Sequence, residues 1–320
     1  MDRADVAAFL AERFGGPVEG VARIGHGEWS RASFFRHAGV EYVARFSALD
    51  EDFLKDRRAM SYAEARLPVP RILDIGEAPG LGFYAISERV RGDFIDTLEA
   101  SDLERVLPSL LVALDAAREA DLSATRGYGG WRADGNAPHA TWREALLDVG
   151  VDEPSRRVHG WRAQLAQSPA GSKAFEVAFE RLQSLAETCP EPRHLVHADL
   201  LNYNVLVADG RVTAVLDWGS SLYGDFLFDV AWLTFWQPWY PAWQGVDFRE
   251  AARRHYAEIG LEVPDFDERM RCCELVIGLD GMAYQAFRSR WADLEATARR
   301  TLAVVGGGGG RVGARATEAG

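Results

Sequence analysis

The sequence predicts an α+β protein of two lobes, a small N-terminal lobe built on an antiparallel sheet and a larger, mainly helical C-terminal lobe. Short apolar runs separated by turn residues fill the chain to residue 90, whereas from Leu98 onward apolar residues recur at helical spacing. The length of 320 residues also exceeds that of one typical domain. We therefore expect lobes at residues 1–90 and 91–304 and a glycine-rich, disordered tail at 305–320.

The composition excludes several classes of protein. A net charge of -12 argues against a nucleic-acid partner, because phosphate backbones demand a basic surface. It permits a cationic ligand without indicating one, since many soluble proteins are acidic. No apolar run approaches the ~20 residues that span a bilayer. The 3 cysteines are too few and too badly spaced for a disulfide framework or a zinc site. We expect a cytoplasmic monomer that binds neither nucleic acid nor membrane.

The N-terminal lobe is expected to begin with an amphipathic helix and three strands. A glycine-bearing turn should join the first two strands, where Gly25 and Gly27 let backbone approach a phosphate and Ser30 adds a hydroxyl donor. A dinucleotide-binding motif would need a helix directly after this turn, but the apolar residues that follow look like a strand. The sequence therefore predicts a hairpin that covers a nucleotide, with a tight turn at Ala38-Gly39 before the third strand.

The third strand carries Arg45, whose permanently charged fork suits a phosphate, although an edge-strand arginine in solvent is the alternative. A helix is expected over residues 51–65, and its acidic partner for Arg45 is either Asp56 or Glu64. Two more strands should precede a link between the lobes at residues 87–92.

In that link, the position in the chain predicts that backbone groups near Glu88 and Val90 receive the adenine edge. The C-terminal lobe then follows with helices, among them those expected at 248–259, at 265–287 and up to about residue 304.

A hairpin lies at the centre of this lobe. Asp209-Gly210 between two apolar runs is a strong indication of a two-residue turn. With that pair at the centre, Val207 faces Val212, and Asn204 is expected opposite Val215.

The open end of the hairpin then carries Asn204 and Asp217, whose oxygens suit one Mg²⁺ ion. Together with His197 and Asp199 they follow the spacing of a protein-kinase catalytic loop and its metal-binding aspartate. An ordinary hairpin with surface Asp and Asn is the alternative, but the joint spacing favours a protein-kinase-like fold.

The segment after the hairpin is rich in aromatic residues. A helix is expected over residues 224–236, in which Asp225 either braces the catalytic loop or places a carboxylate near the helix start. Trp236 and Trp239 follow, and about half of the aromatic rings here should belong to the core. Rings beside carboxylates suit a sugar or an amine, by stacking and cation–π contact.

Over roughly residues 5–290 the chain resembles the aminoglycoside phosphotransferase family, and most of all its hygromycin B phosphotransferase branch. The stretches that carry the similarity are LPVPRILDIGE, the Thr141-Trp142-Arg143 triplet, CPEPRHLVHAD, GRVTAVLDW, the Gly224-Asp225 pair and FWQPW. The resemblance implies transfer of the γ-phosphoryl group of ATP to an aminocyclitol hydroxyl, with Mg²⁺ as cofactor and a cationic antibiotic as substrate.

Within this resemblance Asp199 would be the catalytic base, Asn204 and Asp217 the magnesium ligands and His197 a support for the loop. Arg45 matches the branch at a position where the wider family has lysine. The residues that would line the antibiotic site are Asn202, Trp236 and Trp239.

Tyr203 departs from the family pattern, because a second small amide residue is expected at this substrate-facing position. A kinase of another small hydroxylated amine or sugar is therefore an alternative. An inactive nucleotide-binding module is a second alternative, although it has no physical reason to keep the base and both metal ligands. A protein kinase lacks room, because no long activation segment separates Asp217 from Gly224.

Overall fold

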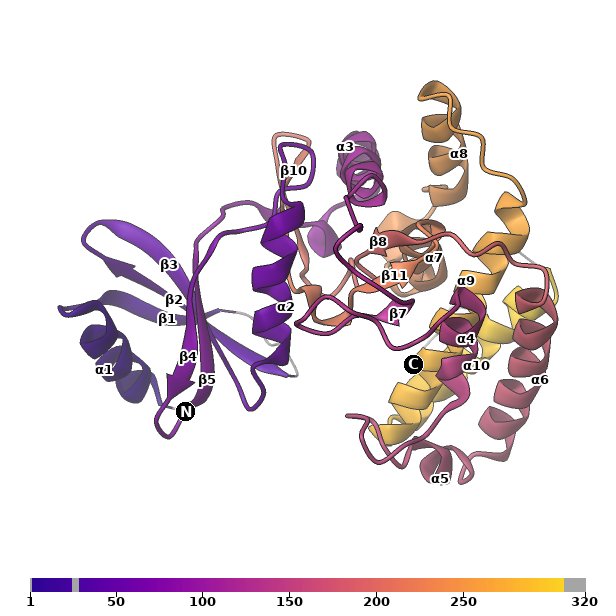
Figure 1. Ribbon diagram of the computed structural model, residues 1–320, viewed down its shortest axis with the longest axis horizontal. Helices are drawn as coiled ribbons and strands as arrows, with labels where there is room; N and C mark the ends of the chain where they lie inside the picture. The colour runs from indigo at the N-terminus through magenta and orange to yellow at the C-terminus, as the bar shows by residue number, and fades with distance from the viewer. Residues whose placement is uncertain (1, 25–28, 308–320) are drawn as a thin grey trace, which may run out of the picture. The chain divides into compact units, whose positions relative to one another are not determined.

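The computed structural model describes residues 2–24 and 29–307, and these divide into two compact units. The first unit comprises residues 1–142 and 191–263, and the second comprises 143–190 and 264–320. The first unit holds the N-terminal sheet together with the central hairpin (Figure 1). These units are not the predicted lobes 1–90 and 91–304, so the lobe boundary at residue 90 stays a prediction. Most of the predicted tail lies outside the described residues.

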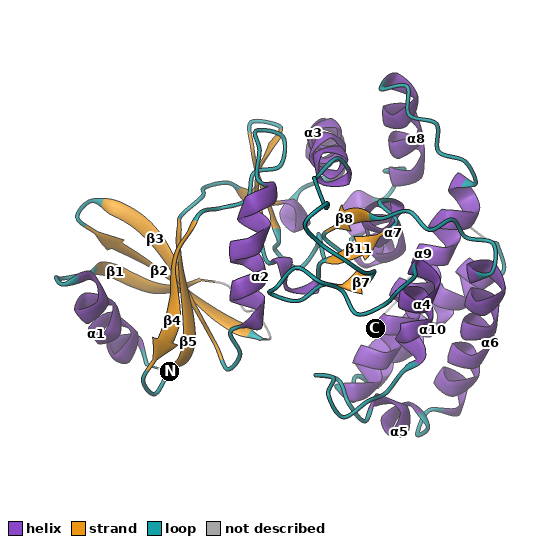
Figure 2. Ribbon diagram, in the orientation of Figure 1, coloured by secondary structure: helices purple, strands orange, loops and turns teal. Residues whose placement is uncertain are grey.

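The N-terminal sheet is antiparallel throughout, with the strand order β1-β2-β3-β5-β4 (Figures 1 and 2). Its strands are β1 Glu19–Ile24, β2 Ser30–His37, β3 Val40–Ser47, β4 Ile72–Ala78 and β5 Gly82–Glu88. The predicted turn at Ala38-Gly39 is confirmed, and both of its residues have positive φ, at 49° and 81°. Such angles are typical of a tight hairpin turn whose twist matches the strands.

Helices α1 (Arg3–Phe14) and α2 (Glu51–Ala59) lie on either side of this sheet (Figure 1). Alternation along β3 explains this arrangement, because Ala44 and Phe46 join the core under α1 while Arg45 points to α2. Burying each large apolar side chain of this core stabilises the fold by about 1.5–3 kcal/mol. The helix predicted over 51–65 ends early, since a 3-10 turn at Met60–Tyr62 tightens the chain before it becomes extended.

Two small sheets hold the middle of the first unit. One has the order β10-β9-β6 and the other β7-β11-β8. Their strands are β6 Asp93–Phe94, β7 Gly129–Gly130, β8 His194–Val196, β9 Val205–Ala208, β10 Arg211–Val215 and β11 Leu222–Gly224. Helix α3 (Ala100–Arg118) packs against β8 and β10, and α8 (Phe248–Glu258) packs against α3 and α7 (Leu227–Trp236). The predicted change from strand to helical periodicity near Leu98 is therefore confirmed at α3.

The helix predicted over residues 224–236 begins three residues later than expected. Gly224 instead ends strand β11, where it pairs with His194. A side chain at Gly224 would lie 2.3 Å from the ring of Trp142, so this strand approaches the ring at a distance that only glycine permits. Pairing within the sheet therefore delays the start of α7 to Leu227.

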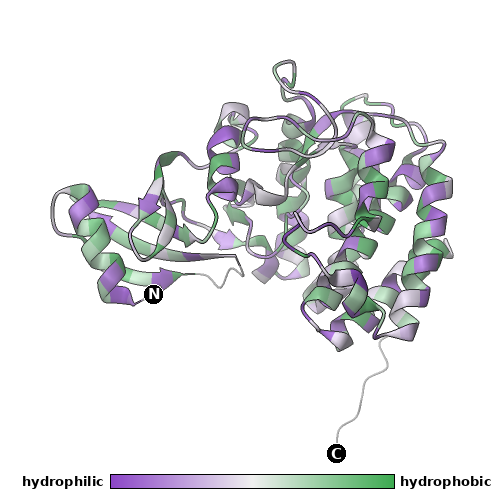
Figure 3. Ribbon diagram, turned by 60° about the horizontal axis from the view of Figure 1, so that its bottom comes forward, coloured by the Kyte–Doolittle hydropathy of each residue, from purple (hydrophilic) through white to green (hydrophobic). Residues whose placement is uncertain are grey.

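The second unit is helical in its described part (Figure 2). Its helices are α5 Trp161–Leu165, α6 Pro169–Ala186, α9 Phe266–Phe287 and α10 Trp291–Val305, and α4 (Trp142–Leu147) enters it from the first unit. The long helices expected at 265–287 and up to about residue 304 are confirmed. Hydrophobic and hydrophilic residues alternate along the helices in Figure 3, as expected when one face of each is buried. In the described chain no helix combines the length and apolar character needed to cross a membrane.

Candidate active site

The central hairpin has the predicted turn but not the predicted register. Asp209 and Gly210 adopt φ of 51° and 72°, and Val207 faces Val212 as expected. The register then shifts by one residue at Thr213, whose hydroxyl donates to the Arg91 carbonyl at 3.3 Å. Asn204 is therefore not opposite Val215 as predicted. Its carbonyl accepts the amide of the next residue, Leu216, at 2.7 Å, which brings the backbone on either side of the open end together.

His197 supports the catalytic loop through both ring nitrogens. Its Nδ1 accepts the Asp199 amide at 3.3 Å, so the proton resides on Nε2, which donates to the Leu216 carbonyl at 2.7 Å. Burial lowers the pKa of His197, which favours this neutral form. The ring thus joins the loop to the second strand of the hairpin, and these contacts are those of a supporting residue.

Asp229 braces the catalytic loop from α7. Its carboxylate accepts the His197 and Ala198 amides at 2.9 and 2.8 Å, and all three residues are buried. Ala198 has a φ of 63°, a conformation that a non-glycine residue keeps only when its surroundings hold it. Of the two alternatives stated for Asp225, the structure shows the carboxylate near the helix start, where it accepts the Leu227 amide at 3.0 Å. The two residues share a helical face in the sequence pattern, but only Asp229 lies inside the helix.

Asp199 has the properties of a general base. Its Oδ1 accepts a hydrogen bond from Asn202 Nδ2 at 3.0 Å, which fixes the orientation of the carboxylate. Burial raises the pKa of Asp199 to about 7, and the negative charges of Asp217 and Asp96 act in the same direction. A base with a pKa near neutrality accepts a proton most effectively at physiological pH.

Asn204 and Asp217 form a donor set that fits one magnesium ion. Asn204 Nδ2 donates to the Asp199 carbonyl at 2.8 Å, which leaves its Oδ1 available as a ligand. The Asp217 carboxylate is 44% exposed and lies on a residue with a φ of 55°. The described residues contain no cluster of three or more His, Cys, Asp or Glu side chains suited to a metal. Two oxygen ligands nevertheless suffice for Mg²⁺, which usually takes the rest from phosphates and water.

The acidic partner of Arg45 is Asp56. Nη2 of Arg45 donates to Asp56 Oδ2, and Nη1 lies 4.0 Å from Asp217 Oδ2. Asp56 Oδ1 accepts the Trp218 amide at 2.7 Å, so this carboxylate joins the arginine to the turn that follows Asp217. Glu64, the other candidate, pairs with Arg66 at 2.6 Å. Because α2 ends at Ala59, Glu64 lies beyond the helix that faces the sheet.

Lys55 makes buried contacts beside the site that the sequence did not predict. Its buried ammonium donates to the carbonyls of Gly219 at 2.5 Å and Ser221 at 3.2 Å, and it lies 4.8 Å from the centre of the Trp131 ring. Lys55 and Asp56 together fasten α2 to the segment after Asp217. A charged residue on an amphipathic helix usually lies in solvent, so the sequence gives no indication of this contact.

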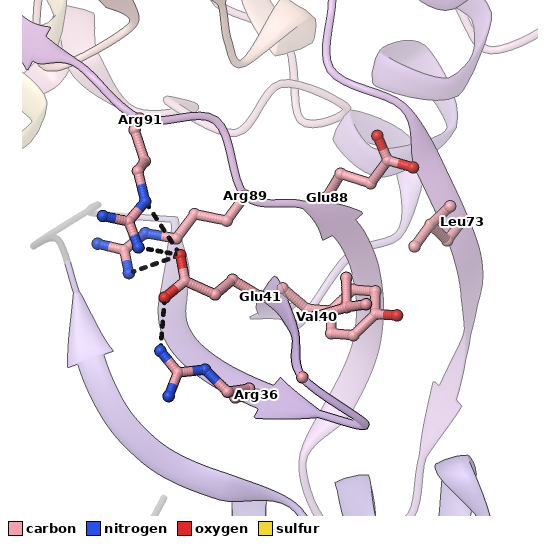
Figure 4. Close-up of a pocket in the computed structure, with 9 residues that line it drawn as sticks. Arg36, Val40, Glu41, Leu73, Glu88, Arg89 and Arg91 are labelled. Atoms are coloured by element: carbon pink, nitrogen blue, oxygen red, sulfur yellow. Dashed lines mark hydrogen bonds and ion pairs between the residues drawn. The ribbon is translucent and has the colours of Figure 1, made fainter.

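Glu41 anchors the chain that follows β5. Its carboxylate binds Arg36 at 2.9 Å and Arg91 at 2.7 Å, with Arg89 at 3.7 Å, and Figure 4 shows the three guanidinium groups converging on it. Its carbonyl also accepts the Arg89 amide at 3.2 Å. The open pocket around Glu41 is lined by Glu88 but not by the predicted base or metal ligands. The ion pairs of Glu41 hold the link between β5 and β6 against β3.

Val90 lies in this anchored link, one residue after the amide that Glu41 engages. Its own amide donates to no acceptor among the residues that the structure describes. An amide held in place and without a partner suits a ligand such as the adenine edge. The predicted roles of Glu88 and Val90 in binding adenine stay predictions. Gly25 and Gly27 lie outside the described residues, and Ser30 begins β2 opposite Ser47.

The aromatic segment after α7 contains both core and accessible rings. Phe235 and Trp243 are fully buried, whereas Trp239 is 37% exposed. The rings of Trp236 and Trp239 meet edge to face with centroids 5.0 Å apart. The indole nitrogen of Trp236 has no acceptor in the described part of the chain. The division between core and accessible rings agrees with the expectation, while contact of Trp236 and Trp239 with substrate stays a prediction.

Tyr203 and Asp96 lie in or against the loop that contains Asp199. Tyr203 is 55% exposed, and its ring meets the edge of Phe94 with centroids 5.3 Å apart. The Asp96 carboxylate accepts the amides of Asn202 at 2.8 Å and Tyr203 at 3.0 Å, and it accepts the Tyr240 hydroxyl at 3.0 Å. Asp96 was not predicted, because no spacing relates it to residues more than 100 positions away along the chain.

Comparison with known proteins decides the family. The pattern of the family described as "Phosphotransferase enzyme family" (APH) matches residues 20–268. The chain belongs to this phosphotransferase family. It is 36% identical over 309 residues to the hygromycin-B 4-O-kinase of Escherichia coli, an alignment that covers 96% of this chain and 86% of the relative.

Solved structures of related phosphotransferases share the fold. A thermostable mutant of the aminoglycoside phosphotransferase APH(4)-Ia, in a ternary complex with AMP-PNP and hygromycin B, superimposes with a TM-score of 0.83 at 34% identity. That match covers 96% of this chain and 100% of the other. A further structure of APH(4)-Ia matches with a TM-score of 0.83 at 34% identity and covers 97% of this chain and 100% of its own. The predicted kinase-like α+β fold and the predicted family are confirmed.

Proposed function

We propose that this phosphotransferase transfers the γ-phosphoryl group of ATP to a hydroxyl of an aminoglycoside antibiotic, with hygromycin B as the substrate. The observation that carries the proposal is the joining of the base to a metal ligand: Asn204 Nδ2 donates to the Asp199 carbonyl and keeps Oδ1 for a cation. Relatives named for hygromycin B, with 36% identity in one case, support this choice of substrate.

In this reaction Asp199 orients the acceptor hydroxyl and takes its proton. The hydrogen bond from Asn202 holds the carboxylate in place, and the bracing of His197 and Ala198 by Asp229 holds the loop. Phosphoryl transfer needs little covalent help from the protein, so positioning and charge stabilisation account for most of the acceleration.

The nucleotide phosphates would be met by Arg45 and Ser30, and the predicted contributions of Gly25 and Gly27 concern residues outside the described part of the chain. Arg45 keeps its direction through Asp56, so its charge is set in place before the nucleotide arrives. Asn204 and Asp217 would hold Mg²⁺, which supplies positive charge to the phosphate oxygens when bound. The Val90 amide would donate to the adenine edge.

The cationic acceptor would lie beside Trp236, Trp239 and Tyr203. Stacking on the two indole rings and attraction to the nearby carboxylates suit an aminocyclitol. We further propose that the enzyme acts as a cytoplasmic monomer without a nucleic-acid partner.

The test is ADP release from ATP and Mg²⁺ with hygromycin B, other aminoglycosides, choline and amino sugars in parallel. The proposal predicts release with hygromycin B well above the rate without acceptor. Release with choline or an amino sugar alone would support a kinase of another small molecule. Absence of release with every acceptor, despite ATP binding, would favour an inactive nucleotide-binding module.

A further inference from the structure

Asp96 occupies a position that brings it to the catalytic loop by strand pairing. It belongs to the 3-10 turn Ile95–Thr97, directly after β6. Strand β6 runs antiparallel to β9, with Phe94 opposite Leu206. Because the strands are antiparallel, the residues after Phe94 lie near the residues before β9, at the end of the catalytic loop.

The carboxylate of Asp96 engages two consecutive amides of that loop. Oδ1 accepts the Asn202 amide at 2.8 Å and Oδ2 accepts the Tyr203 amide at 3.0 Å. Both of these residues adopt left-handed backbone conformations, with φ of 65° and 68°. Non-glycine residues persist in that region only where their surroundings over-determine the conformation. A carboxylate that binds both amides provides such a constraint.

The residue held in this way is the one that orients the base. Asn202 Nδ2 donates to Asp199 Oδ1 at 3.0 Å, so the direction of the Asp199 carboxylate depends on the backbone at Asn202. Asp96 also accepts the Tyr240 hydroxyl at 3.0 Å, which ties the same carboxylate to the aromatic segment.

We propose that Asp96 is a positioning residue for phosphoryl transfer, which holds Asn202 and Tyr203 in their left-handed conformations so that Asn202 orients Asp199. This inference rests on the proposed function, because it takes Asp199 as the base. Asp96 acts through the loop and does not contact the reacting atoms. The fold therefore brings together two segments that are far apart in the sequence, the turn Ile95–Thr97 and the loop that contains Asp199.

The test compares Asp96→Ala with Asp96→Asn in steady-state kinetics with hygromycin B and ATP. Asp96→Ala should lower kcat by about 10- to 100-fold, because a displacement near 1 Å costs up to about 100-fold. The KM for ATP should change less than about threefold, since Arg45 and Asp56 are untouched. Asp96→Asn keeps one acceptor oxygen and should recover part of the loss.

Two control variants separate this role from others. Asp93→Ala removes an exposed carboxylate from β6 and should leave kcat unchanged. Tyr240→Phe removes only the hydroxyl contact of Asp96 and should lower kcat less than threefold. A loss in Tyr240→Phe equal to that in Asp96→Ala would overturn positioning through the loop amides.

Hydrogen exchange gives a readout that needs no substrate. In Asp96→Ala the amides of Asn202 and Tyr203 should exchange faster than in wild type, whereas those of β9 should not change. The proposal is overturned if Asp96→Ala keeps its kcat within twofold, or if only the KM for the acceptor rises. A wild type without ADP release would instead refute the proposed function, and faster exchange in Asp96→Ala would still support the constraint on the loop.

Discussion

Replacing Asp229 with alanine removes the acceptor of two buried amides, those of His197 and Ala198. Both residues are buried, so bulk water has little access to these amides. Leaving one buried donor unpaired costs about 1–3 kcal/mol, so the free energy of unfolding should fall by about 2–6 kcal/mol. The left-handed conformation of Ala198 would also lose the contact that holds it, which displaces the adjacent Asp199.

Urea denaturation followed by Trp fluorescence measures this loss, and kcat measured below the unfolding transition gives the catalytic effect. Asp229→Asn keeps one acceptor oxygen and should lose less stability than Asp229→Ala. Asp93→Ala, which removes an exposed carboxylate from the same unit, serves as the control. A change of less than about 1 kcal/mol in Asp229→Ala would refute the bracing role, since even one unpaired buried amide should cost that much.

Three further predictions concern the groups around the base. Because Asp199 must be deprotonated to act and its pKa is raised to about 7, kcat/KM should fall as the pH drops below about 7, and a flat profile down to about pH 5 would contradict this. In the profile of kcat, which reports the complex with nucleotide and cation bound, the added positive charge should move the acid limb to lower pH. Lys55→Met should raise the KM for ATP by about tenfold, because the turn after Asp217 loses two charge-assisted hydrogen bonds. Arg57→Met, on the exposed face of α2, is the control and should leave the KM for ATP unchanged. Equal effects in the two variants would count against the role of Lys55. Tyr203→Asn, which introduces the small amide residue expected in the family, should change the KM for the acceptor by more than threefold and leave the KM for ATP unchanged. Steady-state kinetics with each substrate varied in turn measures both constants, and an unchanged KM for the acceptor would contradict this prediction.

The catalytic hairpin was predictable because its information is local. Asp209-Gly210 fixes a tight turn between two apolar runs, and the spacing of Asp199, Asn204 and Asp217 requires only that turn and the strands beside it. The bulge at Thr213 was not predictable, since threonine fits a regular strand as well as an irregular one. The bulge placed Asn204 against Leu216 instead of Val215, and Asn204 and Asp217 still lie at the open end of the hairpin.

Contacts made across the fold were the ones that sequence reasoning missed or misassigned. Asp225 and Asp229 share a helical face in the pattern, and the choice between them depended on strand β11, which delays the start of α7. Asp56, and not Glu64, pairs with Arg45 because α2 ends at Ala59. Asp96 depends on the pairing of β6 with β9, a partnership between segments separated by more than 100 residues that no local pattern encodes.

The central claim is that Asp199 is the base of an antibiotic phosphotransferase, and Asp199→Ala tests it most directly. ADP release with hygromycin B and the binding of a non-hydrolysable ATP analogue with Mg²⁺ should be measured on the same preparation. The account predicts that release falls by at least about 100-fold while the affinity for the analogue stays within about threefold. Release at the wild-type rate would contradict it.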